Sequence, residues 1–189
     1  MDFETLNNAI IKCNKCTFIK SEAPSIVGEG SFDAQIIFIC DEVGSEEEKE
    51  NRPLASKAEK LLRVFIASIG LDMGDVYITS LVKCSSEKSK ERVGEQRVNC
   101  LPFLRMEYKL LKPRIVVCLG EVVARHLIRE DFDFGKEHGT YTEKQETFFV
   151  ATYKMRDLVK DPANRFFCSE DFKKIRELII EHSNVKLVF

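Results

Sequence analysis

Four short runs of branched and aromatic apolar residues recur along the chain, separated by longer segments of helical period. The runs are QIIFIC (35–40), VYITSLV (76–82), RIVVCLG (114–120) and TFFVAT (147–152). This alternation is typical of parallel strands joined by crossover helices. The sequence therefore predicts a three-layer α/β/α sandwich around a central four-stranded parallel sheet.

The segments between and after these runs have the apolar spacing of helices. In KAEKLLRVFIASIG (57–70), one helical face gathers the apolar side chains, and Gly70 provides a C-terminal stop. Further helices are predicted at 98–112, 121–128 and 171–182. The chain shows no internal repeat and no evident linker, so we expect a single domain over residues 1–189.

Composition excludes several functional classes. The chain has 29 basic and 31 acidic residues, so no overall positive field attracts nucleic acid, and a DNA contact would need a local basic patch. The N-terminal segment MDFETLNNAIIKCNKC lacks a basic stretch leading into an apolar one. No run reaches the roughly 18 apolar residues of a membrane span. We therefore expect a soluble, cytoplasmic protein.

Four of the seven cysteines form two pairs that could bind a metal. An odd number of cysteines without a secretion signal argues against a disulfide framework. Cys13 and Cys16 form a C-x2-C pair, and the segment between Cys84 and Cys100 allows a second pair to close on it. Four such thiolates suit zinc or an iron-sulfur cluster, and the alternative is ordinary intracellular thiols.

The remaining three cysteines need no metal. Cys40 and Cys118 fall inside predicted strands, where cysteine behaves as a small buried apolar residue. Cys168 falls in a segment with loop character, so we expect a free thiol there.

The order of the elements also locates a candidate site. In an open parallel sheet the ligand crevice lies outside the carboxyl ends of the strands. The positions that fall there are Asp41, Thr79 to Lys83, Gly120 with Glu121, and Tyr153 to Arg156. Asp41 opens a charged segment, DEVGSEEEKEN, whose cluster of glutamates (46–48 and 50) we expect to be a solvated loop.

Several segments, in their order and spacing, match a known family. They include CNKC, IVGEGS, NRPLASKAEKLL, NCLPFL, LLKPRIVVCLGEVVARHL and ATYKMRDLVKDP. Through them nearly the whole chain resembles the family-four uracil-DNA glycosylases, the iron-sulfur branch of their superfamily. The resemblance implies a DNA partner, single-stranded or damaged. It also implies a [4Fe-4S] cluster, ahead of zinc, held by Cys13, Cys16, Cys84 and Cys100.

The motif after the first strand and the base-stacking motif both depart from the family pattern. The family's G-E-A-P-G is here CDEVG, which puts Asp41 in place of the activating glutamate, beside Glu42, and keeps Gly44. The family's G-R-P-F stacks a ring on the flipped base, whereas the chain has NRPL, and Leu54 offers no ring. Glu42, Gly44 and Leu54 are therefore candidate substrate contacts.

The last two motifs of the reaction site have changed as well. The family reads Y-I-T-N and pairs the asparagine amide with uracil, but the chain has Ser80, whose hydroxyl lacks a paired donor and acceptor. The family's T-Y-H-P-A is here TYKMR, so Lys154 replaces the histidine that stabilises the departing base. Asp41 and Lys154 are the candidate catalytic pair.

These replacements leave three functional hypotheses open. The first is an iron-sulfur protein of glycosylase fold that binds DNA with weak or no uracil excision. The second is an active glycosylase on uracil or another damaged base, in which Lys154 stabilises the leaving group or acts as an amine in lyase chemistry. The third is a protein-interaction module that has lost DNA binding. Phosphate contacts are expected from the basic stretch KCSSEKSKERVGEQR, including Lys83, and from Arg156 and Lys160.

Overall fold

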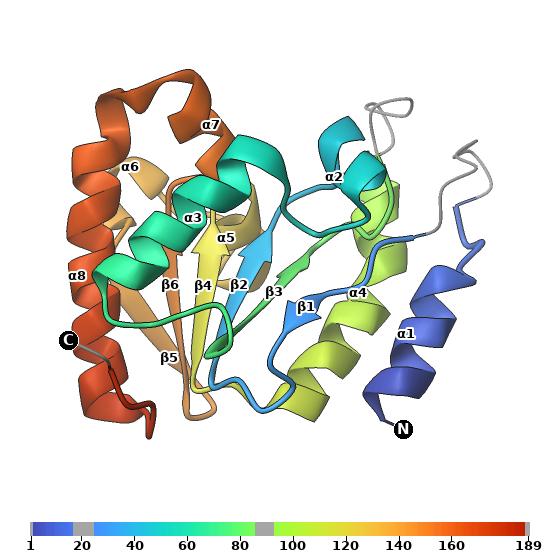
Figure 1. The fold of residues 1–189 in the computed structure, drawn as a ribbon, viewed down its shortest axis with the longest axis horizontal. Helices are drawn as coiled ribbons and strands as arrows, with labels where there is room; N and C mark the ends of the chain where they lie inside the picture. The colour runs from blue at the N-terminus through green and yellow to red at the C-terminus, as the bar shows by residue number, and fades with distance from the viewer. Residues whose placement is uncertain (1, 17–24, 86–92, 188–189) are drawn as a thin grey trace.

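The protein is described by a computed structural model that covers residues 2–16, 25–85 and 93–187. Its six-stranded sheet has the strand order β1-β3-β2-β4-β6-β5 (Figure 1). The strands are β1 (Glu29–Gly30), β2 (Ile36–Cys40), β3 (Val76–Ser80), β4 (Ile115–Leu119), β5 (Tyr141–Lys144) and β6 (Thr147–Thr152). The four central strands run parallel, as the sequence predicts, whereas β1 and β5 pair antiparallel at the two edges. The four-stranded parallel sheet is thus the centre of a larger mixed sheet.

The central strands are mostly apolar because both faces of the sheet are covered. Ile36, Phe38 and Cys40 of β2 point into one core, and Ile37 and Ile39 point into the other. A strand buried on both sides needs apolar residues at every position rather than at alternate ones. This explains why β2 and β4 read as uninterrupted apolar runs; in β3 every residue is buried too, including the polar Thr79 and Ser80.

Helices complete the outer layers. They are α1 (Phe3–Ile11), α2 (Ser45–Glu50), α3 (Ser56–Ser68), α4 (Val93–Leu111), α5 (Glu121–Leu127), α6 (Phe134–Glu137), α7 (Met155–Lys160), the 3-10 turn η2 (Pro162–Asn164) and α8 (Arg165–His182). One face of the sheet packs against α3, α7 and α8, and the other packs against α4 and α5, with α1 alongside α4 (Figure 1). Within the described residues, no helix is both long and apolar enough to cross a membrane.

Two local expectations from the sequence are wrong. The glutamate cluster forms helix α2 rather than a loop, and Glu47 is buried, whereas Glu46 and Glu50 are exposed as expected. Cys168 does not lie in a loop either, because α8 begins at Arg165 and the Cys168 side chain is fully buried. Both expectations treat a polar segment as solvent-exposed. When such a segment forms an amphipathic helix, however, some of its residues face the protein interior.

Candidate active site

Asp41 lies at the carboxyl end of β2, between two cations. Its side chain is 5% exposed. Oδ1 accepts hydrogen bonds from Nε of Arg97 at 3.2 Å and from Nη2 at 2.8 Å. Oδ2 lies 3.7 Å from Nζ of Lys154. Two charge partners therefore hold the carboxylate, one from α4 and one from the segment after β6.

Lys154 caps α7 and reaches across the end of β4. Its Nζ lies 3.7 Å from Asp41 and 3.8 Å from Oε1 of Glu42. Gly120, which follows β4, has φ +106°, and a Cβ added there would stand 3.1 Å from the Cβ of Lys154. Because a positive φ and this close approach both favour glycine, Gly120 makes room for the lysine over the strand end.

A cavity of about 280 Å³ opens beside this pair. Its lining residues come from the ends of β2, β4 and β6 and from α5, α6 and α7: Asp41, Leu119, Gly120, Glu121, Val122, Phe134, Tyr153, Lys154 and Asp157. The rings of Phe134 and Tyr153 meet edge to face with centroids 5.2 Å apart. The structure therefore brings the two candidate catalytic residues to one cavity that has an aromatic wall.

Leu54 and Ser80 do not line this cavity. Leu54 packs into the core beside α3, and Ser80 is fully buried. The Ser80 hydroxyl donates to the carbonyl of Val82 at 2.8 Å, so its donor is already used within the chain. Of the four positions expected around a base, Asp41 and Lys154 meet, whereas Leu54 and Ser80 are withdrawn into the protein.

Glu47 supports the loop beside the candidate site, a role that the sequence does not indicate. It is 1% exposed, and its carboxylate accepts from the backbone N–H of Gly44 and of Ala55, each at 3.1 Å. It also pairs with Arg156. A Cβ on Gly44 would stand 2.9 Å from the Arg156 guanidinium, so Gly44 lets that side chain pack closely. Glu47 thus links the loop after β2 to α7. Arg156, which the sequence predicts to contact DNA, is already paired with Glu47.

Lys83 is placed where no phosphate can reach it. Its side chain is 1% exposed, and its ammonium donates to both carboxylate oxygens of Glu107, at 2.9 and 2.7 Å, and to the hydroxyl of Thr79. The expectation that Lys83 contacts DNA is corrected accordingly. Lys160, by contrast, is exposed at the end of α7. Residues 86–92 of the basic stretch lie outside the described residues.

The four paired cysteines converge where α1, β3 and α4 meet. The hydrogen bond between the Cys84 and Cys100 thiols raises the pKa of Cys84 and lowers that of Cys100. Burial raises the pKa of Cys16, and the nearby Cys100 and Cys13 add to this effect. Asn99 donates to the sulfur of Cys16 at 3.4 Å. The thiols are therefore close enough to influence one another.

These thiols do not close on a single point. Among the described residues, no group of three or more His, Cys, Asp or Glu side chains lies close enough to hold one metal ion. A tetrahedral zinc site needs every thiolate about 2.3 Å from one atom, whereas a [4Fe-4S] cluster distributes four thiolates over four irons. Four cysteine thiols gathered in one region are the ligand type that both groups use.

The fold and the cavity define an α/β protein whose site lies at the carboxyl edge of a parallel sheet. A model of the uracil DNA glycosylase superfamily matches residues 27–179, which include β2, Asp41, Lys154 and most of α8. The chain belongs to this superfamily.

Individual relatives agree with this assignment. The chain is 31% identical over 186 residues to the type-4 uracil-DNA glycosylase of Sulfurisphaera tokodaii, covering 94% of this chain and 84% of the relative. It is 30% identical over 177 residues to the type-4 enzyme of Archaeoglobus fulgidus, covering 89% of each. It is also 28% identical over 187 residues to that of Saccharolobus solfataricus, with 94% and 87% covered. The similarity extends over nearly the whole of each protein.

Proposed function

We propose that the chain is a DNA-binding iron-sulfur member of the uracil-DNA glycosylase superfamily with weak or no uracil excision. The main support for this proposal is the surroundings of Asp41, whose carboxylate accepts a hydrogen bond from Arg97 and lies close to the ammonium of Lys154. A carboxylate that orients water must offer a free oxygen to that water. Both oxygens of Asp41 face cations, so the group is poorly disposed for this task.

Recognition of uracil is weakened for a separate reason. Ser80 and Leu54 stand where the family has its amide and its stacking ring, and both are buried away from the cavity. A site that hydrogen-bonds the edge of a base discriminates against other bases, because a wrong base leaves buried polar groups of the site without a partner. Here the Ser80 hydroxyl is satisfied by Val82, so no such group faces the cavity from β3.

The proposal assigns the [4Fe-4S] cluster to Cys13, Cys16, Cys84 and Cys100. When bound, such a cluster supplies one-electron redox chemistry and links the segments that carry its ligands. The N–H of Lys83 points at the sulfur of Cys100 from 3.5 Å, and Asn99 donates to Cys16. Hydrogen bonds to sulfur of this kind stabilise thiolates and tune the potential of a cluster.

The test measures binding and excision on the same single-stranded oligonucleotide carrying one uracil. We expect measurable binding at low salt and uracil release at least about 10²-fold slower than by the Archaeoglobus fulgidus relative assayed alongside. Asp41→Asn serves as the control for residual activity from this site. Multiple-turnover release that Asp41→Asn abolishes would refute the proposal, and an absence of binding at low salt would favour a protein-interaction module.

The cavity beside Asp41 and Lys154 supports a second candidate, a glycosylase for another damaged base. Its 280 Å³ volume and its wall of Phe134 and Tyr153 suit a flat aromatic ring. The Lys154 ammonium would stabilise negative charge on the departing base, or its neutral amine would attack the sugar. A panel of lesion-bearing oligonucleotides tests the first route. Borohydride trapping on abasic DNA, with Lys154→Ala as control, tests the second. No excision and no Lys154-dependent adduct would eliminate this candidate.

A further inference from the structure

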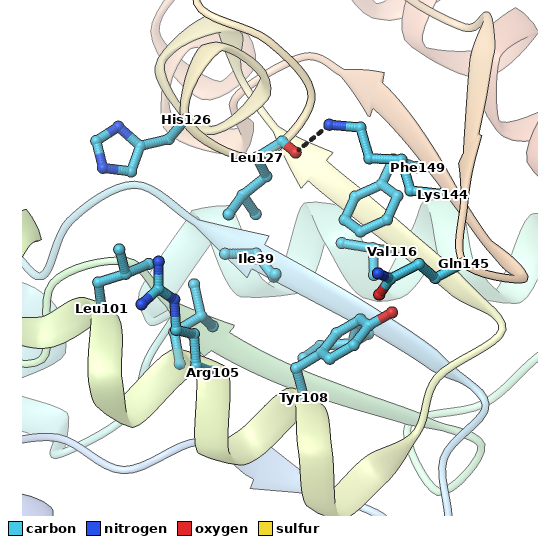
Figure 2. Close-up of a pocket in the computed structure, with 12 residues that line it drawn as sticks. Ile39, Leu101, Arg105, Tyr108, Val116, His126, Leu127, Lys144, Gln145 and Phe149 are labelled. Atoms are coloured by element: carbon cyan, nitrogen blue, oxygen red, sulfur yellow. Dashed lines mark hydrogen bonds between the residues drawn. The ribbon is translucent and has the colours of Figure 1, made fainter.

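A second and larger cavity lies on the face of the sheet opposite α3 and α8, between α4, α5 and the β5–β6 hairpin (Figure 2). Its volume is about 510 Å³, within the range of roughly 300–1,000 Å³ common to small-molecule sites. It shares no lining residue with the cavity beside Asp41. Base excision at the cavity beside Asp41 therefore does not account for this second cavity.

The interior of this cavity is apolar and held in place. Ile37, Ile39 and Val116 of the two central strands form its floor, and all three belong to the buried core. One wall is aromatic: the ring of Tyr108 on α4 stacks with that of Phe149 on β6, with centroids 6.5 Å apart at 20°. The Tyr108 hydroxyl and the Thr147 hydroxyl are 2.7 Å apart and share a hydrogen bond, which fixes the phenol. An apolar slot with a fixed wall needs little reorganisation to take a ligand.

The charged side chains at the mouth of the cavity are all basic. Arg105 extends from α4, His126 from α5 and Lys144 from β5, and all three are exposed (Figure 2). Among the residues that the structure describes, no aspartate or glutamate lines the cavity, although the chain has 31 acidic residues against 29 basic ones. Charge at this mouth is therefore of one sign, which favours an anion.

Lys144 is already oriented for such a ligand. Its ammonium donates to the carbonyl of Leu127 at 3.1 Å and to that of Ile128, and it lies 5.8 Å from the centroid of the Phe149 ring. An ammonium has three donors, so one is left for a ligand. Arg105 keeps its donors too, since within the described part of the chain it pairs with no carboxylate.

We propose that this cavity is a binding site for a small amphipathic anion, with an aromatic or aliphatic body on Ile39, Val116 and Phe149 and an acidic head at the basic mouth that Arg105 and Lys144 form. The apolar floor binds the body by burial, and the two cations select the negative head. The chemistry is that of an aryl or alkyl carboxylate or sulfonate.

The test uses two fluorescent probes of similar shape, 1-anilinonaphthalene-8-sulfonate, which is anionic, and N-phenyl-1-naphthylamine, which is neutral. The full chain should bind the sulfonate at one site. Arg105→Gln and Lys144→Gln should each weaken that binding about threefold at low salt and leave the neutral probe within about 1.5-fold. Decanoate should displace the sulfonate at lower concentration than decanol does.

Two variants serve as controls. Lys109→Gln makes the same charge change on an exposed α4 residue outside the lining, and Phe166→Ala removes an aromatic ring that is 67% exposed elsewhere on the surface. Neither should alter sulfonate binding. Arg105→Gln should fold normally, because its side chain is exposed. The proposal is overturned if the wild type does not bind the sulfonate, if Lys109→Gln or Phe166→Ala weakens it as much as Arg105→Gln, or if both probes respond alike.

Discussion

The guanidinium of Arg97 lies 2.8 Å from the carboxylate of Asp41, the residue proposed to stand in place of the family's activating glutamate. The two residues are 56 positions apart and come from α4 and the end of β2. Lys154 approaches the other oxygen of the same carboxylate. The centre of the site is thus an ion pair with a second cation beside it.

Removing Arg97 should destabilise the protein. In Arg97→Gln the carboxylate of Asp41 stays buried with Lys154 as its remaining cation, and we expect a loss of about 1–3 kcal/mol in the free energy of unfolding. Urea denaturation followed by circular dichroism measures it. Arg105→Gln is the matched control on the same helix and should change stability by less than about 0.5 kcal/mol. If Arg97→Gln lowers the free energy of unfolding no more than Arg105→Gln does, the ion pair with Asp41 contributes nothing measurable to stability.

Glu47 should be far more sensitive to substitution than its neighbour in sequence. Glu47→Gln keeps a side-chain carbonyl for one backbone N–H but loses the second acceptor and leaves the half-buried Arg156 without its charge partner. We expect a loss of about 2–4 kcal/mol. Glu46→Gln, on the exposed side of α2, should be close to neutral. Thermal unfolding of both variants side by side gives the comparison, and a neutral Glu47→Gln would contradict the structural role.

The contrast between Glu46 and Glu47 shows where sequence reasoning stops. Nothing in the run of glutamates distinguishes the buried one, because its partners at Gly44, Ala55 and Arg156 meet only in the folded chain. The role of Arg97 could not be predicted for the same reason. A basic stretch predicts phosphate contacts, but its sequence does not show which of its side chains face the interior. Lys83 was misread likewise, because its partner Glu107 is 24 residues away on α4.

The central sheet could be predicted because its signal is local. The apolar runs of β2, β3, β4 and β6 each occupy consecutive residues, so double-sided burial is visible in the sequence itself. The edge strands lack that signal. β5 is YTEK, with three of its four residues exposed, and β1 has only two residues. Edge strands are held by backbone pairing with a neighbour, which composition does not record.

The proposed DNA binding gives a prediction that separates two expected phosphate contacts, Lys160 and Lys83. Lys160→Gln should weaken binding to a single-stranded oligonucleotide about two- to threefold and reduce the slope of log K against log salt by roughly 0.7. Lys83→Met removes an equal charge, but from the interior, and should leave both quantities unchanged in the folded fraction. Fluorescence anisotropy between about 25 and 200 mM salt measures them. If Lys83→Met alters the salt slope as Lys160→Gln does, the assignment of Lys83 to the interior is wrong.

The cysteines outside the proposed cluster should resist alkylation in the native protein. Burial raises the pKa of Cys40, Cys118 and Cys168 to about 12. Because only the thiolate reacts, a thiol with that pKa has about one reactive molecule in ten thousand at pH 8, and burial blocks the reagent as well.

Iodoacetamide at pH 8, followed by peptide mass spectrometry, should therefore leave Cys40, Cys118 and Cys168 unmodified in the folded chain and label all three in denaturant. Cys13, which is partly exposed, is the internal control and should be labelled in protein stripped of iron. Raising the pH toward 10 increases the thiolate fraction about a hundredfold, but labelling should still await unfolding because the three side chains are inaccessible. Fast labelling of Cys168 in the native protein would show that α8 separates readily from the sheet. We expect no such opening, because the Cys168 side chain is fully buried.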